Sequence, residues 1–235
     1  MGIDLLYGYL AEKLEEVLRI NHEMVDRVAV AITEAHLAGH AIYGFGSGHS
    51  ALLIEEMYYR AGGLNLIRPI WDFDVMIHHD PLSASERERT PGYAQKVLAK
   101  THFNPGDMLW LVSNSGRNAL LMEMAVAAKA QGVQVIALTS LNHSQAVEPH
   151  GPSHEKLYQV ADFVLDNRGA IGDAGFWVTG VPAPMIPTST ILGAVLVHAV
   201  WMQVAEKLVA AGFVPEILRS FNLDHPIPDQ MGSAG

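Results

Sequence analysis

The stretch Ala41-Ile42-Tyr43-Gly44-Phe45-Gly46-Ser47-Gly48-His49-Ser50 joins a short apolar run to a turn rich in glycine and serine. An apolar run bounded by turn residues is typical of a buried strand, and glycine permits the tight backbone of the turn. The amphipathic segment that follows has the spacing of a helix and ends at Gly62-Gly63. This part of the chain therefore predicts a strand, a tight turn and a helix, in that order.

The same unit occurs a second time further along the chain. Met108-Leu109-Trp110-Leu111-Val112 leads through Ser113-Asn114-Ser115-Gly116-Arg117-Asn118 into a helix rich in alanine and methionine that stops at Gly132. Three further runs have the composition of strands, over residues 64–71, 133–138 and 162–166. Strands that alternate with helices pair in parallel through right-handed crossovers.

We therefore expect an α/β fold with a doubly wound, five-stranded parallel sheet of the flavodoxin-like order 2-1-3-4-5, flanked by helices. In such a sheet the ligand binds beyond the carboxyl ends of the strands, at the point where the strand order reverses. For this order that point lies between the first and third strands. The two serine-rich turns follow those two strands, so we expect them to form one site.

The N-terminal segment predicts a long helix over residues 4–38, which Asn21-His22 could divide. A helix of roughly 34 residues is about 50 Å long, longer than the strands that it covers. The excess should extend beyond the domain, and we expect it to contribute to a homodimer or homotetramer. The prediction rests on apolar residues at helical spacing, namely Leu6, Leu10, Leu14, Val17, Met24, Val28, Ile32 and Ala35.

The remaining segments indicate a single domain over residues 1–235 with a core at about 30–212. Thr188-Ser189-Thr190 begins a second long apolar helix that reaches about Ala211. A tail that contains prolines occupies residues 213–235. The segment 167–187, which holds many glycines and prolines, gives no pattern.

Composition argues against several classes of partner. With 25 acidic and 15 basic side chains the formal net charge is -10, which opposes the electrostatic attraction behind nucleic-acid binding. The chain has no cysteine, so disulfides and thiolate nucleophiles are excluded. Asp4 and Glu12 do not fit a signal peptide, and no apolar run approaches the ~18 residues of a membrane span. We expect a cytoplasmic protein that binds neither nucleic acid nor membrane.

Both serine-rich turns combine small residues with hydroxyl and amide groups at the start of a helix, where free N–H groups favour an anion. Neither turn contains lysine, and no G-x-x-x-x-G-K-[ST] pattern occurs in the chain, which argues against nucleoside triphosphates. A phosphate group is the expected ligand. The simpler interpretation is that these residues only cap helices and shape turns. The candidate phosphate contacts are Ser47, His49, Ser50, Ser113, Asn114, Ser115 and Asn118.

A dinucleotide site is an alternative for the first turn, because residues 46–51 fit the pattern G-x-G-x-x-A after a strand. That motif requires an acidic residue at the end of the second strand, and Asp72 and Asp74 come somewhat late for it. The second, serine-rich turn also has no role in a pyrophosphate fingerprint. A single phosphate group is the preferred interpretation.

These motifs resemble those of the SIS, or sugar isomerase, domain, a family of phosphosugar-binding proteins. The family pattern has a G-x-G-x-S turn, here Gly46–Ser50, and an S-x-S-G turn after a later strand, here Ser113–Gly116. Its third element, a Ser/Thr-rich start to the last helix, is similar to Thr188, Ser189 and Thr190. The resemblance covers about residues 30–212. It is strongest to small stand-alone bacterial members, near phosphoheptose isomerase and a branch with G-H-S and S-N-S-G-R-N.

The resemblance implies that these elements hold a sugar phosphate in an oligomeric α/β sandwich. In phosphoheptose isomerase two helices carry side chains that act in catalysis and can hold zinc, and these positions fall on Glu56, Arg60, Thr190 and His198. Only His198 keeps the family residue, so we expect neither a metal nor another cofactor. Glu56 and His198 form the candidate base and acid pair. The alternatives are an i,i+4 ion pair of Glu56 with Arg60, and a core or interface position for His198.

The resemblance favours an isomerase that binds a phosphorylated sugar and interconverts its aldose and ketose forms. Carboxylate and imidazole groups can move protons near neutral pH without a redox cofactor. The alternative is a protein that senses the sugar phosphate without turnover, because a fold alone does not fix a reaction. The sequence does not identify the sugar, nor does it separate isomerisation from ether cleavage or epimerisation.

Overall fold

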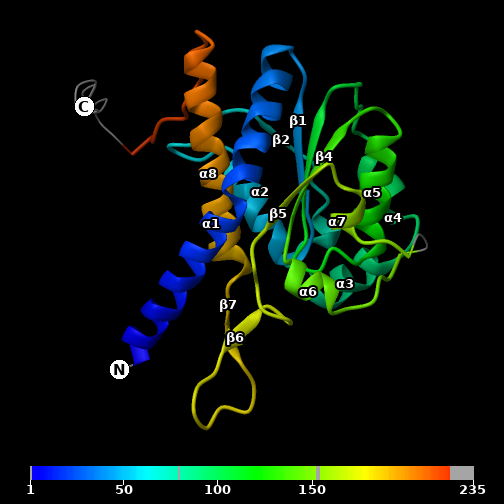
Figure 1. The fold of residues 1–235 in the computed structure, drawn as a ribbon. Helices are drawn as coiled ribbons and strands as arrows, with labels where there is room; N and C mark the ends of the chain where they lie inside the picture. Colours follow the sequence, from blue (N-terminus) through cyan, green and yellow to red (C-terminus); the bar gives the residue numbers. More distant parts are fainter. Residues whose placement is uncertain (1, 79, 152–153, 223–235) are drawn as a thin grey trace, which may run out of the picture.

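A five-stranded, all-parallel sheet in the order β2-β1-β3-β4-β5 forms the centre of the molecule (Figure 1). The structure is a computed structural model and describes residues 2–78, 80–151 and 154–222. The expected fold class and strand order are confirmed. The strands are β1 Ile42–Gly46, β2 Ile67–Pro69, β3 Met108–Val112, β4 Gln134–Thr139 and β5 Phe163–Asp166.

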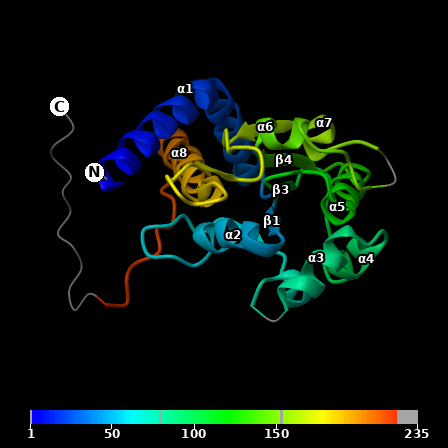
Figure 2. The ribbon, with the colours of Figure 1, turned by 90° about the horizontal axis from the view of Figure 1, so that it is seen from below.

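Helices cover both faces of the sheet (Figure 2). The central strand β3 is buried along its whole length because its side chains alternate between two apolar cores. Trp110 belongs to the core under α1, α2 and α8, whereas Leu109 and Leu111 belong to the core under α4, α5 and α7. The two sets of helices are α1 Gly2–Leu37, α2 Ala51–Met57 and α8 Ser189–Ala210 on one face, and α4 Tyr93–Leu98, α5 Ala119–Lys129 and α7 Leu157–Val160 on the other.

The first crossover helix, α2, ends at Met57, five residues before the glycine pair that the sequence marks as its end. Tyr58 adopts an extended backbone, and the C-terminal segment then pairs with the chain that follows. Gly62 N–H donates to the Leu218 carbonyl at 2.8 Å, and Leu218 N–H donates to Gly63 at 3.0 Å. The C-terminal segment thus pairs with residues 62–65, between the end of α2 and the start of β2. The expected tail is described only as far as residue 222.

Several elements lie in segments that showed no clear pattern in the sequence. The polar segment 72–90 contains α3, whose first turn is capped by Asp80, which accepts from Leu82 N–H at 3.1 Å. The segment 167–187 contains an antiparallel hairpin. These additional elements are η1 Gly48–Ser50, η2 Phe73–Val75, α3 Pro81–Arg89, α6 Leu141–Gln145, β6 Ala174–Phe176 and β7 Met185–Pro187.

The long helix α1 runs unbroken through Asn21, where a division was considered. The side chain of Asn21 is buried and pairs with the backbone of Asp166 at the end of β5. Its Nδ2 donates to the Asp166 carbonyl at 2.8 Å, and Asp166 N–H donates to its Oδ1 at 2.9 Å. The amide therefore satisfies both backbone groups of this residue at the edge of the sheet, as a further strand would.

Helix α8 is long and apolar enough to cross a membrane by length and composition alone, which the sequence prediction had excluded. Its most apolar window of 18 residues has a mean hydropathy of 1.4. The helix nevertheless contributes Leu196, Val200 and Trp201 to the core that it shares with α1 and the sheet. Packing between two layers therefore accounts for its apolar composition.

Replacement of Asn21 by alanine should lower the free energy of unfolding by about 2–4 kcal/mol, because it leaves the buried N–H and C=O of Asp166 without partners. The neighbouring His22 is exposed on the same helix, and His22→Ala should change the same quantity by less than about 0.5 kcal/mol. Urea unfolding followed by circular dichroism measures both. Equal effects of the two substitutions would contradict the bridging role of Asn21.

Candidate functional site

The two serine-rich turns begin side by side. Strand β1 ends at Gly46 and β3 ends at Val112, and the register of the sheet pairs these two residues. A Cβ atom at Gly46 would lie 2.6 Å from the carbonyl oxygen of Ser50, so only glycine allows the first turn to fold back this closely. The expected meeting of the two turns at the switch point of the sheet is thus present.

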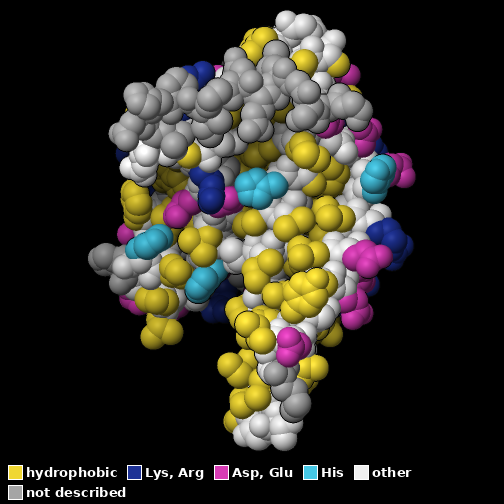
Figure 3. Space-filling view, turned by 90° about the vertical axis from the view of Figure 1, so that its left-hand side faces the viewer, with side chains coloured by type: hydrophobic (Ala, Val, Ile, Leu, Met, Phe, Trp, Pro, Cys, Tyr) yellow, Lys and Arg dark blue, Asp and Glu magenta, His cyan; other side chains and the backbone are white. Residues whose placement is uncertain are grey.

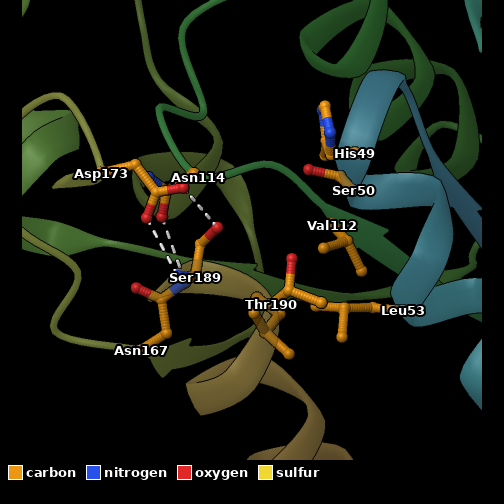
Figure 4. A pocket seen from close by; sticks show the side chains of 10 residues that line it. His49, Ser50, Leu53, Val112, Asn114, Asn167, Asp173, Ser189 and Thr190 are labelled. Carbon is orange, nitrogen blue, oxygen red and sulfur yellow. Dashed lines mark hydrogen bonds between the residues drawn. The ribbon is translucent and has the colours of Figure 1, made fainter. Parts of the chain in front are cut away.

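A small cavity of about 110 Å³ lies between these turns and the start of α8, and we call it the inner cavity (Figure 4). His49 and Ser50 lie on one side of it, and Asn114 and Asp173 lie on the opposite side. A cavity of about 150 Å³ binds a benzene molecule, so this smaller cavity has room for a group of the size of a phosphate and not for a whole sugar phosphate. The lining residues are His49, Ser50, Leu53, Val112, Asn114, Leu138, Asn167, Asp173, Ser189 and Thr190.

The predicted phosphate contacts divide into two groups. His49, Ser50, Asn114, Ser189 and Thr190 line the inner cavity. The others are not among its lining residues, and one of them shapes a turn, since the Oγ of Ser113 accepts from Gly116 N–H at 3.1 Å. In this second group Ser47, Ser113, Asn118 and Thr188 are buried and Ser115 is half-buried.

Helix capping does not account for these side chains. Ser50, Asn118 and Thr188 precede α2, α5 and α8, yet within the described part of the chain none of them makes a side-chain capping hydrogen bond. The Oδ1 atom of Asn118 is buried without a hydrogen-bond partner among the described residues. By contrast, Ser140 caps α6 by accepting from His143 N–H at 3.1 Å. The simpler interpretation of the two turns as caps therefore does not describe the hydroxyl and amide groups at the site.

Two polar residues of the inner cavity, Asn167 and Asp173, were not identified from the sequence. Nδ2 of Asn167 donates to Oδ1 of Asn114 at 3.1 Å. The Asp173 carboxylate accepts from Ser189 N–H at 2.9 Å and from the Ser189 hydroxyl at 2.7 Å. A carboxylate thus binds the first turn of α8, where the sequence predicted contacts to phosphate. Both residues lie in the segment 167–187, whose many glycines and prolines gave no pattern of helix or strand from which a site could be predicted.

A histidine supports the turn that carries Asp173. The Nδ1 atom of His143 accepts from Gly172 N–H at 3.1 Å, which requires that nitrogen to be unprotonated. Burial is the largest cause that lowers the pKa of His143, Arg117 lowers it further, and Asp173 partly opposes the shift. The neutral ring is therefore favoured at neutral pH and keeps its hydrogen bond to the turn.

A larger cavity of about 420 Å³ adjoins the inner one and shares Leu53 and Thr190 with it; we call it the outer cavity. It opens along α2 and beyond its C-terminal end. The combined shape offers a small polar compartment followed by a roomier one, in the volume range of ligand pockets of about 300–1,000 Å³. Its lining residues are Leu52, Leu53, Glu55, Glu56, Tyr58, Tyr59, Arg60, Thr190 and Ala194.

The predicted pair Glu56 and His198 is in direct contact, with His198 Nε2 at 2.9 Å from Glu56 Oε1. The side chain of His198 is 57% exposed, so it is not a core residue. Arg60 contacts the other carboxylate oxygen of Glu56, and the expected ion pair is therefore present as well. Close packing of α8 on α2 permits the contact, because a Cβ at Gly193 would lie 2.5 Å from Leu53 Cδ1.

The acidic and histidine side chains do not gather into a metal centre in the described part of the chain. Within residues 2–78, 80–151 and 154–222, no group of three or more His, Asp or Glu side chains is arranged to hold a metal ion. The carboxylate of Glu56 is instead shared between an imidazole and a guanidinium group. The carboxylate of Glu56 can therefore exchange a proton with His198 and form an ion pair with Arg60.

Comparison with known proteins agrees with this architecture. The SIS domain model matches residues 7–140, which include most of α1 and both serine-rich turns, and the chain belongs to the SIS domain family. Within that class it is similar to UPF0309 proteins. It is 34% identical over 223 residues to one from Shouchella clausii, covering 94% of this chain and 91% of the relative. It is 37% identical over 211 residues to one from Halalkalibacterium halodurans, covering 90% and 87%.

Solved structures show the same fold. The phosphoheptose isomerase GmhA from Neisseria gonorrhoeae aligns with a TM-score of 0.54 at 18% identity, covering 88% of this chain and 100% of that one. A phosphoheptose isomerase from Francisella tularensis aligns with a TM-score of 0.54 at 16% identity, covering 88% and 99%. At these identities the likeness concerns the fold. The residues of the site must be judged by their own geometry.

Proposed function

We propose that the protein binds a phosphorylated sugar, with the phosphate in the inner cavity and the sugar ring in the outer cavity. The observation that carries this proposal is the pair of joined cavities, one of phosphate size and one of ligand size. Two solved proteins of the same fold are phosphoheptose isomerases by name, which supports the same class of ligand.

The proposed phosphate contacts are the side chains predicted from the sequence that line the inner cavity, namely His49, Ser50, Asn114, Ser189 and Thr190. Figure 4 shows the hydroxyls of Ser50 and Thr190 directed into the cavity, facing Asn114 from different elements. The Asp173 carboxylate would repel a phosphate, by about 4 kcal/mol for unit charges 4 Å apart at an effective dielectric constant near 20. The phosphate oxygens therefore lie toward Ser50 and Thr190, away from Asp173. Ser47, Ser113, Ser115, Asn118 and Thr188 form the surrounding turns.

We further propose that the protein is an isomerase of the aldose–ketose type. Glu56 takes the proton from the carbon next to the carbonyl, and His198 gives a proton to the carbonyl oxygen to form an enediol. Glu56 then gives its proton to the former carbonyl carbon. His198 takes a proton from the hydroxyl on the other carbon, which becomes the new carbonyl. The 2.9 Å contact between the two side chains supports this division of roles.

The apolar surface of α1 and α8 supports a homodimer or homotetramer. The N-terminal half of α1 projects from the body of the molecule (Figure 1) and exposes 78% of Ile3 and 75% of Tyr7. Hydrophobic side chains gather on the side of the molecule where α1 and α8 lie (Figure 3). Met202 and Val209 of α8 are also exposed. Contiguous apolar surface of this kind favours association, and a second copy of the chain is the proposed partner.

The binding proposal predicts that glucose 6-phosphate raises the melting temperature and that glucose does not. A ligand at a hundredfold excess over its Kd stabilises by about 2.7 kcal/mol. Ser50→Ala should weaken phosphosugar binding by about 1–3 kcal/mol, as expected for loss of a hydrogen bond to a charged group. Ser83→Ala, in α3 and outside both cavities, serves as the control. Equal shifts with the sugar and its phosphate would contradict the proposal.

The catalytic proposal predicts that Glu56→Gln preserves binding but lowers turnover by ~10²–10⁴, the usual contribution of a general base. The assay follows exchange of deuterium from solvent into the carbon next to the carbonyl. Arg60→Ala is the matched control, because it removes the ion pair and leaves the carboxylate. If Glu56→Gln and Arg60→Ala lower the melting temperature alike and neither reduces exchange, Glu56 is structural. Binding without exchange in the wild type would favour a sensor.

The oligomer proposal predicts a dimeric or tetrameric mass by light scattering at micromolar concentration. Replacement of Ile3 and Tyr7 by lysine should shift the mass toward the monomer, because charges at an apolar interface are not compensated. Lysine at Glu12, which already is exposed and polar, should leave the mass unchanged. A monomeric wild type would contradict the proposal.

A further inference from the structure

The first half of α1 and the hairpin of β6 and β7 project together from the body of the molecule (Figure 1). We call this unit the arm and define it as residues 2–16 and 174–187. Its two parts are in contact, because the ring of Tyr9 packs edge-on against Phe176 with 5.5 Å between centroids. A Cβ atom at Gly175 would lie 2.6 Å from the Tyr9 hydroxyl, so the hairpin lies directly against the helix.

The arm does not bury its apolar side chains in its own domain. None of residues 2–16 is buried, and the first buried residue of α1 is Val17. Residues 174–187 include no Asp, Glu, Lys, Arg or His, yet Trp177 is 67% exposed. Most helical stability comes from tertiary packing, and a two-stranded hairpin alone is marginally stable in water. The arm therefore needs a covering surface.

The apolar stripe of α1 indicates what kind of surface covers it. Ile3, Tyr7, Leu10 and Leu14 recur at a spacing of four, three and four residues, which is the spacing of a helix seam packed against a partner. Three residues further on, the same stripe reaches Val17 and enters the core. One half of the seam is thus covered by the chain itself, and the other half is left open.

A second copy of the chain fits the arm better than a membrane does. Glu12 and Glu15 are exposed beside the seam and the net charge is -10, which opposes contact with an anionic membrane surface. Charged residues are depleted at the centres of protein interfaces, most of all in permanent homodimers. Two copies related by a two-fold axis present the same seam and the same uncharged hairpin to each other.

The base of the hairpin adjoins the inner cavity. Strand β6 begins directly after Asp173, and β7 ends directly before Thr188. The Asp173 carboxylate accepts from Thr188 N–H at 3.3 Å, beside its two bonds from Ser189. Asp173 and Ile186 have positive φ angles of 71° and 61°, which persist only where the surroundings impose them. A contact that fixes the hairpin therefore also fixes Asp173 at the start of α8.

Resting on the proposed function, we propose that a second copy of the chain covers the arm and that this contact sets the inner cavity for the phosphate group. While the hairpin is held, the Asp173 carboxylate stays on the amides of α8 and leaves the rest of the cavity to the phosphate. Assembly and phosphosugar binding are then coupled. The coupling is reciprocal, so that each strengthens the other.

Sedimentation velocity and calorimetry with glucose 6-phosphate test this coupling. Trp177→Asp places an uncompensated charge at the contact and should raise the dissociation constant of the oligomer tenfold or more. At a protein concentration where the wild type is assembled and the variant is dissociated, the variant should bind glucose 6-phosphate at least fivefold more weakly. Saturating glucose 6-phosphate should in turn lower the dissociation constant of the wild-type oligomer by at least fivefold.

Two further variants control this experiment. Trp177→Ser removes the ring without adding a charge and should show both losses to a smaller extent. Leu82→Asp lies in α3, at an exposed position outside the arm and both cavities, and should change neither quantity. Because Trp177 is exposed in the single chain, its replacement should leave the melting temperature of the dissociated protein unchanged.

The outcomes separate the coupling from the proposed function. If Trp177→Asp leaves the mass unchanged, the arm is not the interface and the proposal is overturned. If the mass falls while the affinity for glucose 6-phosphate stays within twofold, the coupling is overturned and the phosphosugar site stands. If the assembled wild type binds no glucose 6-phosphate, the proposed function and the coupling fail together. Binding to phosphatidylcholine vesicles that Trp177→Asp abolishes, without a change in mass, would make the arm a membrane contact and overturn the proposal.

Discussion

Parallel pairing of β1 with β3 sets Gly46 opposite Val112, and both serine-rich turns leave the sheet at that point. The chain then continues into α2 on one face and α5 on the other, so the turns diverge around a small space. The third wall comes from α8, which packs closely on α2 at Gly193, where a Cβ atom would lie 2.5 Å from Leu53 Cδ1. The same packing brings His198 to Glu56. One strand pair and one helix contact therefore position both cavities.

The sheet was predictable because its strands coincide with short apolar runs in the sequence. Met108–Val112 is apolar at every position, and the structure assigns β3 the same five residues. The end of α2 was not predictable in this way, because it depends on hydrogen bonds between Gly62 and Leu218, which are far apart in the chain. Asn21 illustrates the same limit. A polar residue in a helix suggested a break, whereas its amide pairs with the backbone of Asp166.

The site was predictable at the level of turns and not at the level of side chains. A switch point between two known strands identifies the turns, since topology alone brings them together. Which side chain faces the cavity depends on the path of each turn, and so Ser50 lines it while Ser47 is buried elsewhere in the turn. Asp173 lies outside any motif. It reaches the site because its positive φ of 71° and the bonds to Ser189 fix the loop over α8.

The position of Asp173 also bears on where affinity and selectivity come from. Its carboxylate accepts a hydrogen bond from Ser189 N–H, the first amide of α8. The N-terminal end of a helix favours an anion, and here a carboxylate of the chain itself occupies this position. A phosphate in the inner cavity must therefore rely on the hydroxyls and amides of the two turns, which lack the charge of a lysine. Every phosphosugar presents the same phosphate group, so contacts to the phosphate alone do not discriminate among phosphosugars. In the proposed binding mode, selectivity among phosphosugars depends on the outer cavity, which is lined by Glu56, Tyr59 and Arg60 among others.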